Sequence, residues 1–164
     1  MSWTYSKFNH SFMRDKKFRS LASSDARYLM LWFMLNEHQV SIGCYRLPDG
    51  YAVSDTGFEL ERYRRIRDDL EAAGLIMYDT DSMEVLIVDW FEHNPPMNDR
   101  HATGIRKEIS SIESDTLRSF AEERFLMAEE LRPPDKPKRV PKEDVARLVT
   151  SVALQRRIDP FNRV

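Results

Sequence analysis

The sequence predicts a mainly α-helical protein with a small β-hairpin, and a change of hydrophobic period at Gly74 carries this prediction. Before Gly74, within residues 59–73, apolar side chains recur at the spacing of one helix face. They are Leu60, Tyr63, Ile66, Leu70 and Ala73. After Gly74, residues 76–78 and 85–88 are rich in the β-branched and aromatic types that favour strands. Glycine readily adopts the left-handed turn that ends a helix, so we expect a helix that leads directly into a hairpin.

The N-terminal part of the chain predicts an arm followed by a buried helix. Residues 1–20 show no clean period, and we expect an extended arm that packs its aromatic rings onto the rest of the protein. These rings include Trp3, Phe8, Phe12 and Phe18. Ser23 or Ser24 is a suitable N-cap for a helix at residues 26–37. Its centre is apolar on every side, so we expect this helix to be buried.

The next elements complete a recognisable order. Residues 42–47 predict a short strand, and residues 51–56 predict a helix of barely two turns that ends before Gly57. Residues 79–82 have the turn chemistry that joins two strands of a hairpin. Helix, strand, short helix, longer helix and hairpin is the order of a winged helix-turn-helix domain. In that arrangement residues 59–73 form the recognition helix and the hairpin forms the wing.

Two further helices are predicted after the hairpin, at residues 101–112 and 114–131. Pro95 and Pro96 stop the last strand, and Ser114 is a suitable start for the second helix. The predicted divisions are a winged-helix domain with an N-terminal arm (residues 1–112), a helical extension (113–131), a Pro/Lys/Arg linker (132–141) and a C-terminal amphipathic helix (142–164).

The C-terminal helix carries an apolar stripe that we expect to bind a partner. Its members are Val145, Leu148, Val149 and Val152. A short helix with such a stripe is marginal in isolation and requires a surface that covers it. That surface is the winged-helix body, a second copy of the chain or a recruited protein, and the stiff linker before the helix favours another chain.

Composition and charge argue against several classes of protein. A net charge of −2 argues against a protein held to nucleic acid by bulk electrostatics, although residues 132–164 carry nine Lys and Arg against four Asp and Glu. The single cysteine, Cys44, excludes an internal disulfide and fits a cytoplasmic location. The apolar runs are far shorter than the roughly 20 residues that a membrane helix requires. The sequence shows no phosphate loop, nucleophile elbow or metal-ligand spacing, so we expect neither an enzyme nor a cofactor or metal.

Several short motifs within residues 1–112 occur in an order that a known family shares. The most specific is Trp90-Phe91 followed by His93-Asn94-Pro95-Pro96, and the others include Asp15-Lys16-Lys17-Phe18, Ala26-Arg27-Tyr28-Leu29 and Gly74-Leu75-Ile76. With these motifs the chain resembles the N-terminal winged-helix domain of phage-type replication initiation proteins, the replisome-organiser group. The resemblance implies a domain that binds DNA at a replication origin, often as an oligomer. It also implies a C-terminal part that recruits the helicase or its loader.

The candidate DNA contacts lie on the recognition helix and in the N-terminal arm. They are Arg62, Arg64, Arg65, Lys16, Lys17 and Arg19. Recognition helices contact base edges and phosphates of double-stranded DNA with such side chains. Residues 59–73 also hold five acidic residues against four arginines, so an alternative is a solvated helix face with the pairs Arg64–Asp68 and Arg65–Asp69.

Two alternative functions follow from the same fold. One is a winged-helix transcriptional regulator. The other is a phage-encoded winged-helix protein that inhibits a host system by protein–protein binding, and the acidic recognition helix and wing favour it.

Overall fold

The computed structural model describes residues 8–133 of the 164-residue chain. The chain divides into two units, Met1–Pro133 and Pro134–Val164. The predicted linker beyond residue 133 and the predicted C-terminal helix lie outside the described residues. The partner-binding stripe of Val145, Leu148, Val149 and Val152 lies there as well, so it stays a prediction.

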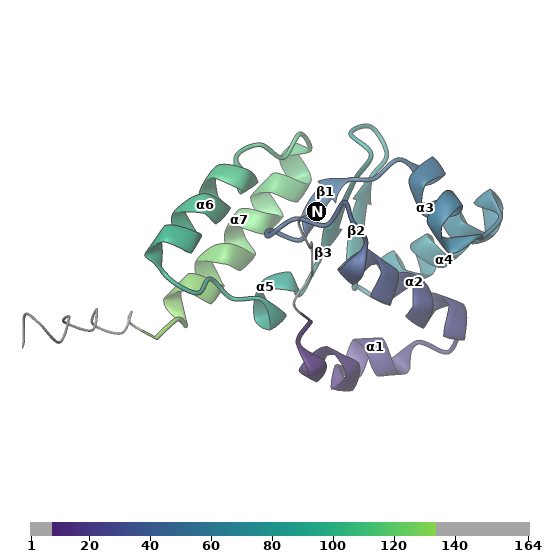
Figure 1. Cartoon of the computed structure of the whole chain (residues 1–164), viewed down its shortest axis with the longest axis horizontal. Coiled ribbons are helices and arrows are strands. Elements are labelled where there is room, and N and C mark those ends of the chain that lie inside the picture. Colours follow the sequence, from purple (N-terminus) through teal and green to yellow (C-terminus); the bar gives the residue numbers. More distant parts are fainter. Residues whose placement is uncertain (1–7, 134–164) are drawn as a thin grey trace, which may run out of the picture. The chain divides into compact units, whose positions relative to one another are not determined.

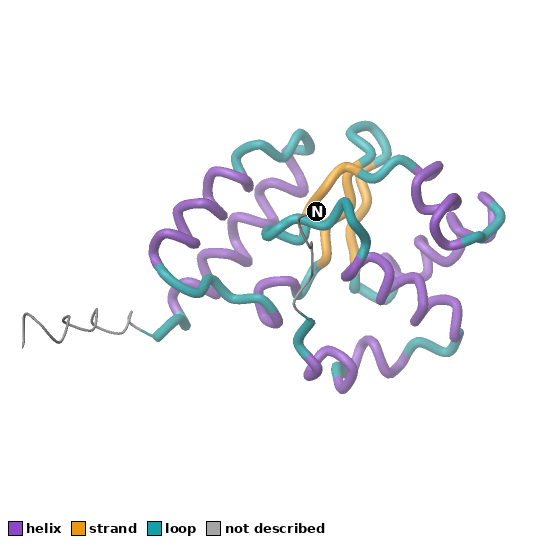
Figure 2. The backbone as a smooth tube through the Cα atoms, viewed as in Figure 1, coloured by secondary structure: helices purple, strands orange, loops and turns teal. Residues whose placement is uncertain are grey.

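The described part of the chain is mostly helical, with one small antiparallel sheet of three strands (Figures 1 and 2). In chain order the elements are η1 (His10–Arg14), α1 (Lys16–Ser20), α2 (Ser24–Leu35), β1 (Cys44–Arg46), α3 (Asp49–Thr56), α4 (Leu60–Ala72), β2 (Ile76–Asp79), β3 (Glu84–Ile87), α5 (Trp90–His93), α6 (Asp99–Ile109) and α7 (Asp115–Glu130). The strand order is β1-β3-β2. The predicted fold class is therefore confirmed, and α2 to β3 follow the winged-helix order.

The sheet has two differently covered faces because successive side chains of a strand alternate in direction. On one face, Tyr45 of β1 lies opposite Val85 of β3 and donates its hydroxyl to the carbonyl of Phe33 in α2, at 2.7 Å. On the other face, Glu84 of β3 accepts a hydrogen bond from the backbone N–H of Ser114, at the start of α7. The sheet therefore lies between α2 to α4 and α6 to α7, as Figure 1 shows.

The N-terminal segment is helical, so the prediction of an extended arm is wrong for residues 10–20. Asp15 explains the difference, because its carboxylate accepts hydrogen bonds from the backbone N–H groups of Lys17 and Phe18 and so caps α1. The expected packing of the aromatic rings is confirmed where the chain is described. Phe12 and Phe18 are buried with their ring centroids 4.9 Å apart.

The junction of α4 and the hairpin has the geometry that Gly74 predicts. Gly74 adopts a φ of 66°, its N–H donates to Glu71, and the N–H of Leu75 donates to the carbonyl of Leu70 at 3.1 Å. This pair of bonds closes the helix and turns Leu75 into the core.

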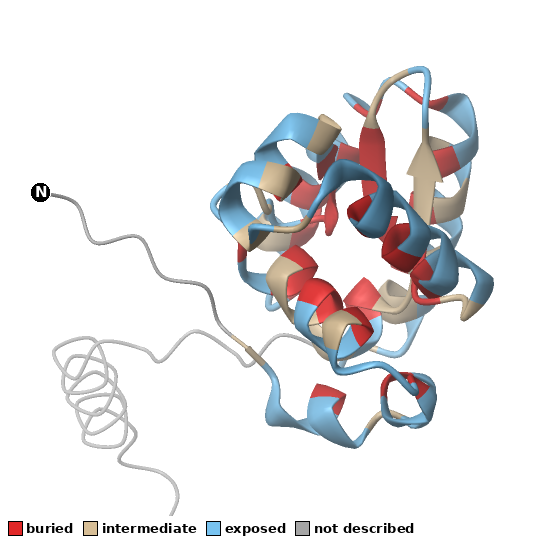
Figure 3. Cartoon of the chain, turned by 90° about the vertical axis from the view of Figure 1, so that its right-hand side faces the viewer, coloured by how far each residue is buried: buried red, intermediate tan, exposed pale blue. Residues whose placement is uncertain are grey.

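One hydrophobic core joins all described elements, and Figure 3 shows its residues on the inward sides of the helices and strands. Met30, Phe33, Leu70 and Ile87 belong to it, as their positions in the pattern predict. The expected burial of the helix at residues 26–37 holds for only part of it, because Leu31 and Trp32 are half-buried and Leu35 in the last turn of α2 is 46% exposed.

The helices after the sheet extend the core beyond the winged-helix elements. β3 ends at Ile87, before α5, so the prediction that Pro95 and Pro96 stop the last strand is wrong. Trp90 and Phe91 are buried in the short helix α5, and Trp90 Nε1 donates to the carbonyl of Ser41 at 2.8 Å. The Phe91 ring lies 5.5 Å from that of Phe125 in α7. Ser114 caps α7, as its position predicts. Within residues 8–133, no helix has the length and the apolar content needed to cross a membrane.

Candidate functional site

The outer side of α4 is the candidate site that the winged-helix arrangement points to. Tyr63, Ile66 and Leu70 face inward, because they are at most 6% exposed. The helical period then directs the intervening residues outward. The exposed charged residues are Glu61, Arg62, Arg64, Arg65, Asp68, Asp69 and Glu71. This side of the helix therefore carries more acidic than basic residues.

Arg62 is bound to the neighbouring helix α2. Its guanidinium forms an ion pair with the carboxylate of Asp25, in the first turn of α2. The guanidinium carbon also lies 5.2 Å from the ring centroid of Phe58, which makes an edge contact with Tyr28. Arg62 thus joins α4 to α2, and its charge is largely balanced within the protein.

Arg64 and Arg67 both bind Asp49 at the start of α3. Arg64 Nε lies 2.8 Å from one carboxylate oxygen of Asp49, and Arg67 Nη1 lies 2.9 Å from the other. Arg67 is only 8% exposed and stacks 4.1 Å from the ring centroid of Tyr78 in β2. These contacts hold α3 against α4. Arg64 pairs with Asp49 and Glu61, so its predicted pairing with Asp68 is wrong.

Arg65 is the arginine of the outer side of α4 whose charge stays unbalanced. It is exposed and forms no ion pair with any residue of the described part of the chain. The spacing that suggested a pair with Asp69 therefore does not produce one. Of the predicted contacts on α4, Arg65 is the one most available to an external anion.

Of the three N-terminal cations predicted to contact DNA, one is paired with a carboxylate and two are not. Lys17 Nζ lies 2.6 Å from Asp89, and it also reaches the carbonyl of Gly74 at 3.4 Å. Asp89 pairs in addition with Arg124 of α7. Lys16 and Arg19 are exposed, and neither has a carboxylate partner within residues 8–133.

The hairpin that corresponds to the wing is acidic and is bound to α7. Asp79 accepts hydrogen bonds from the Ser114 hydroxyl at 2.5 Å and from the N–H groups of Asp81 and Ser82. The Ser114 hydroxyl, and then these backbone groups, lower the pKa of Asp79 below its ordinary value. Glu84 accepts from the N–H groups of Glu113 and Ser114. Residues 79–84 contain no Lys or Arg, so the wing offers no side-chain cation to a phosphate.

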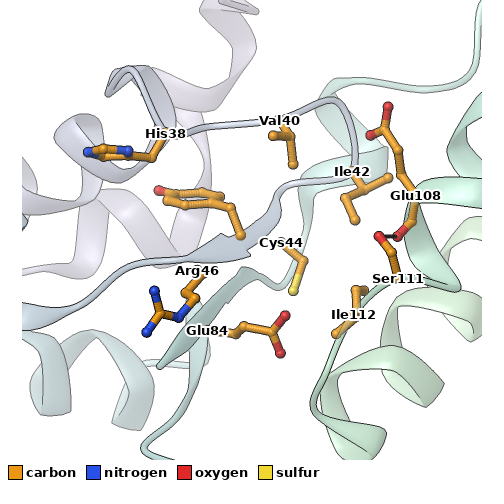
Figure 4. A pocket seen from close by; sticks show the side chains of 10 residues that line it. His38, Val40, Ile42, Cys44, Arg46, Glu84, Glu108, Ser111 and Ile112 are labelled. Atoms are coloured by element: carbon orange, nitrogen blue, oxygen red, sulfur yellow. Dashed lines mark hydrogen bonds between the residues drawn. The ribbon is translucent and has the colours of Figure 1, made fainter. Parts of the chain in front are cut away.

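A pocket of about 360 Å³ opens between β1, β3 and the end of α6 (Figure 4). Its lining residues are His38, Val40, Ile42, Cys44, Tyr45, Arg46, Glu84, Glu108, Ser111 and Ile112. The carboxylate of Glu84 is occupied by backbone N–H groups, and that of Glu108 accepts from the Ser41 hydroxyl. Burial, with a smaller effect of Glu84, raises the pKa of Cys44 to about 12. The thiol therefore stays protonated at neutral pH, and Cys44 packs in the core like a small apolar side chain.

His93, in the most specific sequence motif, and His101, in the following helix, both contact neighbouring groups of the protein. His93 Nδ1 lies 3.4 Å from the Ser11 hydroxyl, and its ring makes an edge contact with Phe12. His101 Nδ1 accepts from the backbone N–H of Met97. Among residues 8–133, no group of three or more His, Cys, Asp or Glu side chains is arranged to hold a metal ion.

Comparisons of the chain with models of protein families, with curated proteins and with solved structures find no match.

The residues that sequence reasoning missed are the carboxylates that bind the cations. Asp25, Asp49 and Asp89 decide which of the predicted contacts carry an unbalanced charge. Their partners are 37, 15 and 72 positions away in sequence, and no local spacing rule connects residues so far apart.

Proposed function

We propose that the protein is a non-enzymatic DNA-binding protein of the phage replication-initiation type, which binds double-stranded DNA and recruits a protein partner in the cytoplasm. The observation that carries this proposal is the winged-helix arrangement of α2 to β3, in which α4 exposes a polar side at the recognition position. The motif Trp90-Phe91 followed by His93-Asn94-Pro95-Pro96 supports the replication type through its resemblance to the replisome-organiser group. A helicase or a helicase loader is the partner that this resemblance implies.

The charges of α4 indicate weak binding by one copy of the protein. The acidic side chains of its outer side outnumber the arginines, and Arg62 and Arg64 are paired within the protein. A DNA phosphate must then compete with Asp25 and Asp49 for these arginines. Binding of several copies to adjacent sites compensates for a low affinity per copy, so we expect the protein to bind as a homo-oligomer.

The test is a fluorescence anisotropy titration of the full chain with a labelled duplex at low salt, repeated at increasing salt. Binding should weaken steeply with salt, because cations that bind phosphates release counterions. Arg65→Ala should weaken it, whereas Arg100→Ala should leave it nearly unchanged, because Arg100 is also exposed but lies on α6. If the full chain binds neither duplex nor single strand at low salt, the proposal fails.

The protein-binding function is a second candidate that a specific observation favours. The wing is acidic, and two of the three exposed arginines of α4 are bound to carboxylates of the same chain. Such a surface fits a basic protein surface better than a phosphate backbone. Absence of DNA binding, together with a stoichiometric complex with a purified replication protein in size-exclusion chromatography, would favour this candidate.

A further inference from the structure

Four exposed cations without an ion-pair partner in the described chain occur within residues 14–27, at its N-terminal end. They are Arg14, Lys16, Arg19 and Arg27, and we call them the N-terminal basic surface. They lie on η1, on α1 and in the first turns of α2, outside the helix-turn-helix formed by α3 and α4. We propose that this surface holds the sugar-phosphate backbone of the bound DNA, while α4 supplies only a minor part of the attraction. The proposal rests on the DNA-binding function proposed above.

The carboxylates within the same segment do not balance these four charges. Asp15 accepts hydrogen bonds from the N–H groups of Lys17 and Phe18 and caps α1. Asp25 is paired with Arg62 of α4. None of the four cations has an ion-pair partner within residues 8–133. An external anion is therefore the partner that their charge can still bind.

Two hydrogen bonds within the protein fix the orientation of the Arg27 side chain. Its Nε donates to the carbonyl of Leu21 at 3.0 Å, and its Nη2 donates to the carbonyl of Arg19 at 3.2 Å. Both acceptors are neutral, so these bonds orient the guanidinium beside α1 without balancing its charge. A cation that is already oriented loses less conformational entropy when it binds a phosphate.

The basic surface flanks the proposed recognition helix. Lys17, within α1, reaches the carbonyl of Gly74 just beyond the end of α4, at 3.4 Å. Asp25, in the first turn of α2, reaches Arg62 in the first turns of α4. α2 therefore packs along α4, whereas α1 meets the chain just beyond the C-terminal end of α4. Figure 1 shows the loop that joins α1 to α2. A duplex that lies against α4 passes close to the segment from α1 to α2.

The charges of the two surfaces decide which one attracts the DNA. With Arg62 and Arg64 paired, the outer side of α4 retains Arg65 against several carboxylates and repels phosphates on balance. The N-terminal basic surface holds four cations without an ion-pair partner in the described chain against the single carboxylate of Asp15. Because phosphates carry no base information, binding through this surface is largely independent of the DNA sequence.

The test compares neighbouring lysines that differ in pairing. Lys16→Ala combined with Arg19→Ala should weaken duplex binding more than about tenfold near 0.1 M salt and lower the slope of log K against log salt by about two. Lys17→Ala is the matched control, because Asp89 already holds Lys17, and it should change the affinity less than about twofold. Both effects should be the same on two duplexes of unrelated sequence. Circular dichroism and thermal melts check that every variant is folded, and Arg14→Ala serves as a second variant of the surface.

Three outcomes would overturn the inference. If the wild-type protein binds DNA but the Lys16/Arg19 variant binds equally well with the same salt slope, the inference fails and the proposed function stands. If Lys17→Ala weakens binding as much as the double variant, an ion pair within the protein does not prevent a cation from binding DNA. The inference then fails. If the wild-type protein binds no DNA, the proposed function and the inference fail together.

Discussion

At the scale of single residues, a few acidic side chains determine which Lys and Arg side chains are available to bind an external anion. Lys16 and Lys17 are neighbours of the same type, yet Lys17 is held by Asp89 and Lys16 is exposed without a carboxylate partner in the described chain. Asp89 itself is largely buried, and it also binds Arg124. Charge counts along a sequence therefore overestimate the number of cations that remain available to an external anion.

The backbone conformation and the packing at position 43 require a glycine. Gly43 adopts a φ of 66°, and a Cβ at this position would lie 2.3 Å from Cγ of Trp90. Gly43→Ala should therefore lower the free energy of unfolding by about 2 to 4 kcal/mol, through backbone strain and overpacking. Urea denaturation followed by tryptophan fluorescence measures the change.

Gly104 is the control for this substitution. It lies inside α6, and a Cβ there would meet no atom within 4 Å. Gly104→Ala should raise the free energy of unfolding by about 0.5 to 1 kcal/mol, because alanine favours a helix. Equal effects of the two substitutions would show that Gly43 is not under the constraint described.

At the scale of elements, the hairpin is joined to the start of α7 by two carboxylates. Glu84 binds the N–H groups of Glu113 and Ser114, and Asp79 binds the Ser114 hydroxyl. These bonds satisfy backbone groups ahead of the helix that would otherwise lack a partner. They also hold the wing against the helical layer, so the wing is less free to follow a DNA groove than a hairpin joined only to its own domain.

The Asp79 contact predicts a dependence of stability on pH. Its pKa in the folded protein lies below the ordinary value of 3.8, so the contact stabilises the fold fully above that value. The stabilisation is lost as the pH falls through the lower pKa of the folded state. Thermal melts of Asp79→Asn between pH 6 and pH 2 should therefore show a smaller acid-induced loss than the wild-type protein. Asp81→Asn is the control, because Asp81 is exposed, and a loss as small as that of Asp79→Asn would contradict the assignment.

At the scale of the whole molecule, residues 8–133 hold a continuous hydrophobic core. Its buried apolar residues extend from Phe12 to Phe125, and the sheet, the helix-turn-helix and α5 to α7 all contribute to it. The first unit of the chain ends at Pro133. It has the size of an ordinary domain, which can bury enough apolar surface to fold alone.

A chain that ends at Pro133 should consequently fold without residues 134–164. We expect one cooperative thermal transition and a far-ultraviolet circular dichroism spectrum of a mainly helical protein. Broad melting together with strong binding of a hydrophobic dye would show that the core described is incomplete. Comparison of the oligomeric state and the partner binding of the truncated and full chains then tests the predicted role of Val145, Leu148, Val149 and Val152.

The sequence predicts correctly those helix and strand boundaries that depend on neighbouring residues. The change of period at Gly74 predicts the end of α4 and the start of β2, and Ser114 predicts the start of α7. These features depend on backbone conformations and caps within a few residues, so they are readable before any tertiary structure is known.

The tertiary structure alone decided which cations are available and which faces are buried. Arg62, Arg64 and Lys17 meet carboxylates 37, 15 and 72 positions away, and these meetings exist only once α2, α3 and the end of β3 have packed against their neighbours. Leu35 is exposed because it lies on the outer side of the last turn of α2, whereas Phe33 and Met34 of the same turn are buried, although the apolar character of Leu35 predicts burial. The sequence by itself determined the order of the elements from α2 to β3, since hydrophobic period and caps act locally. The charge pattern of the surface was decided by packing, since an ion pair depends on distance in space and not on distance along the chain.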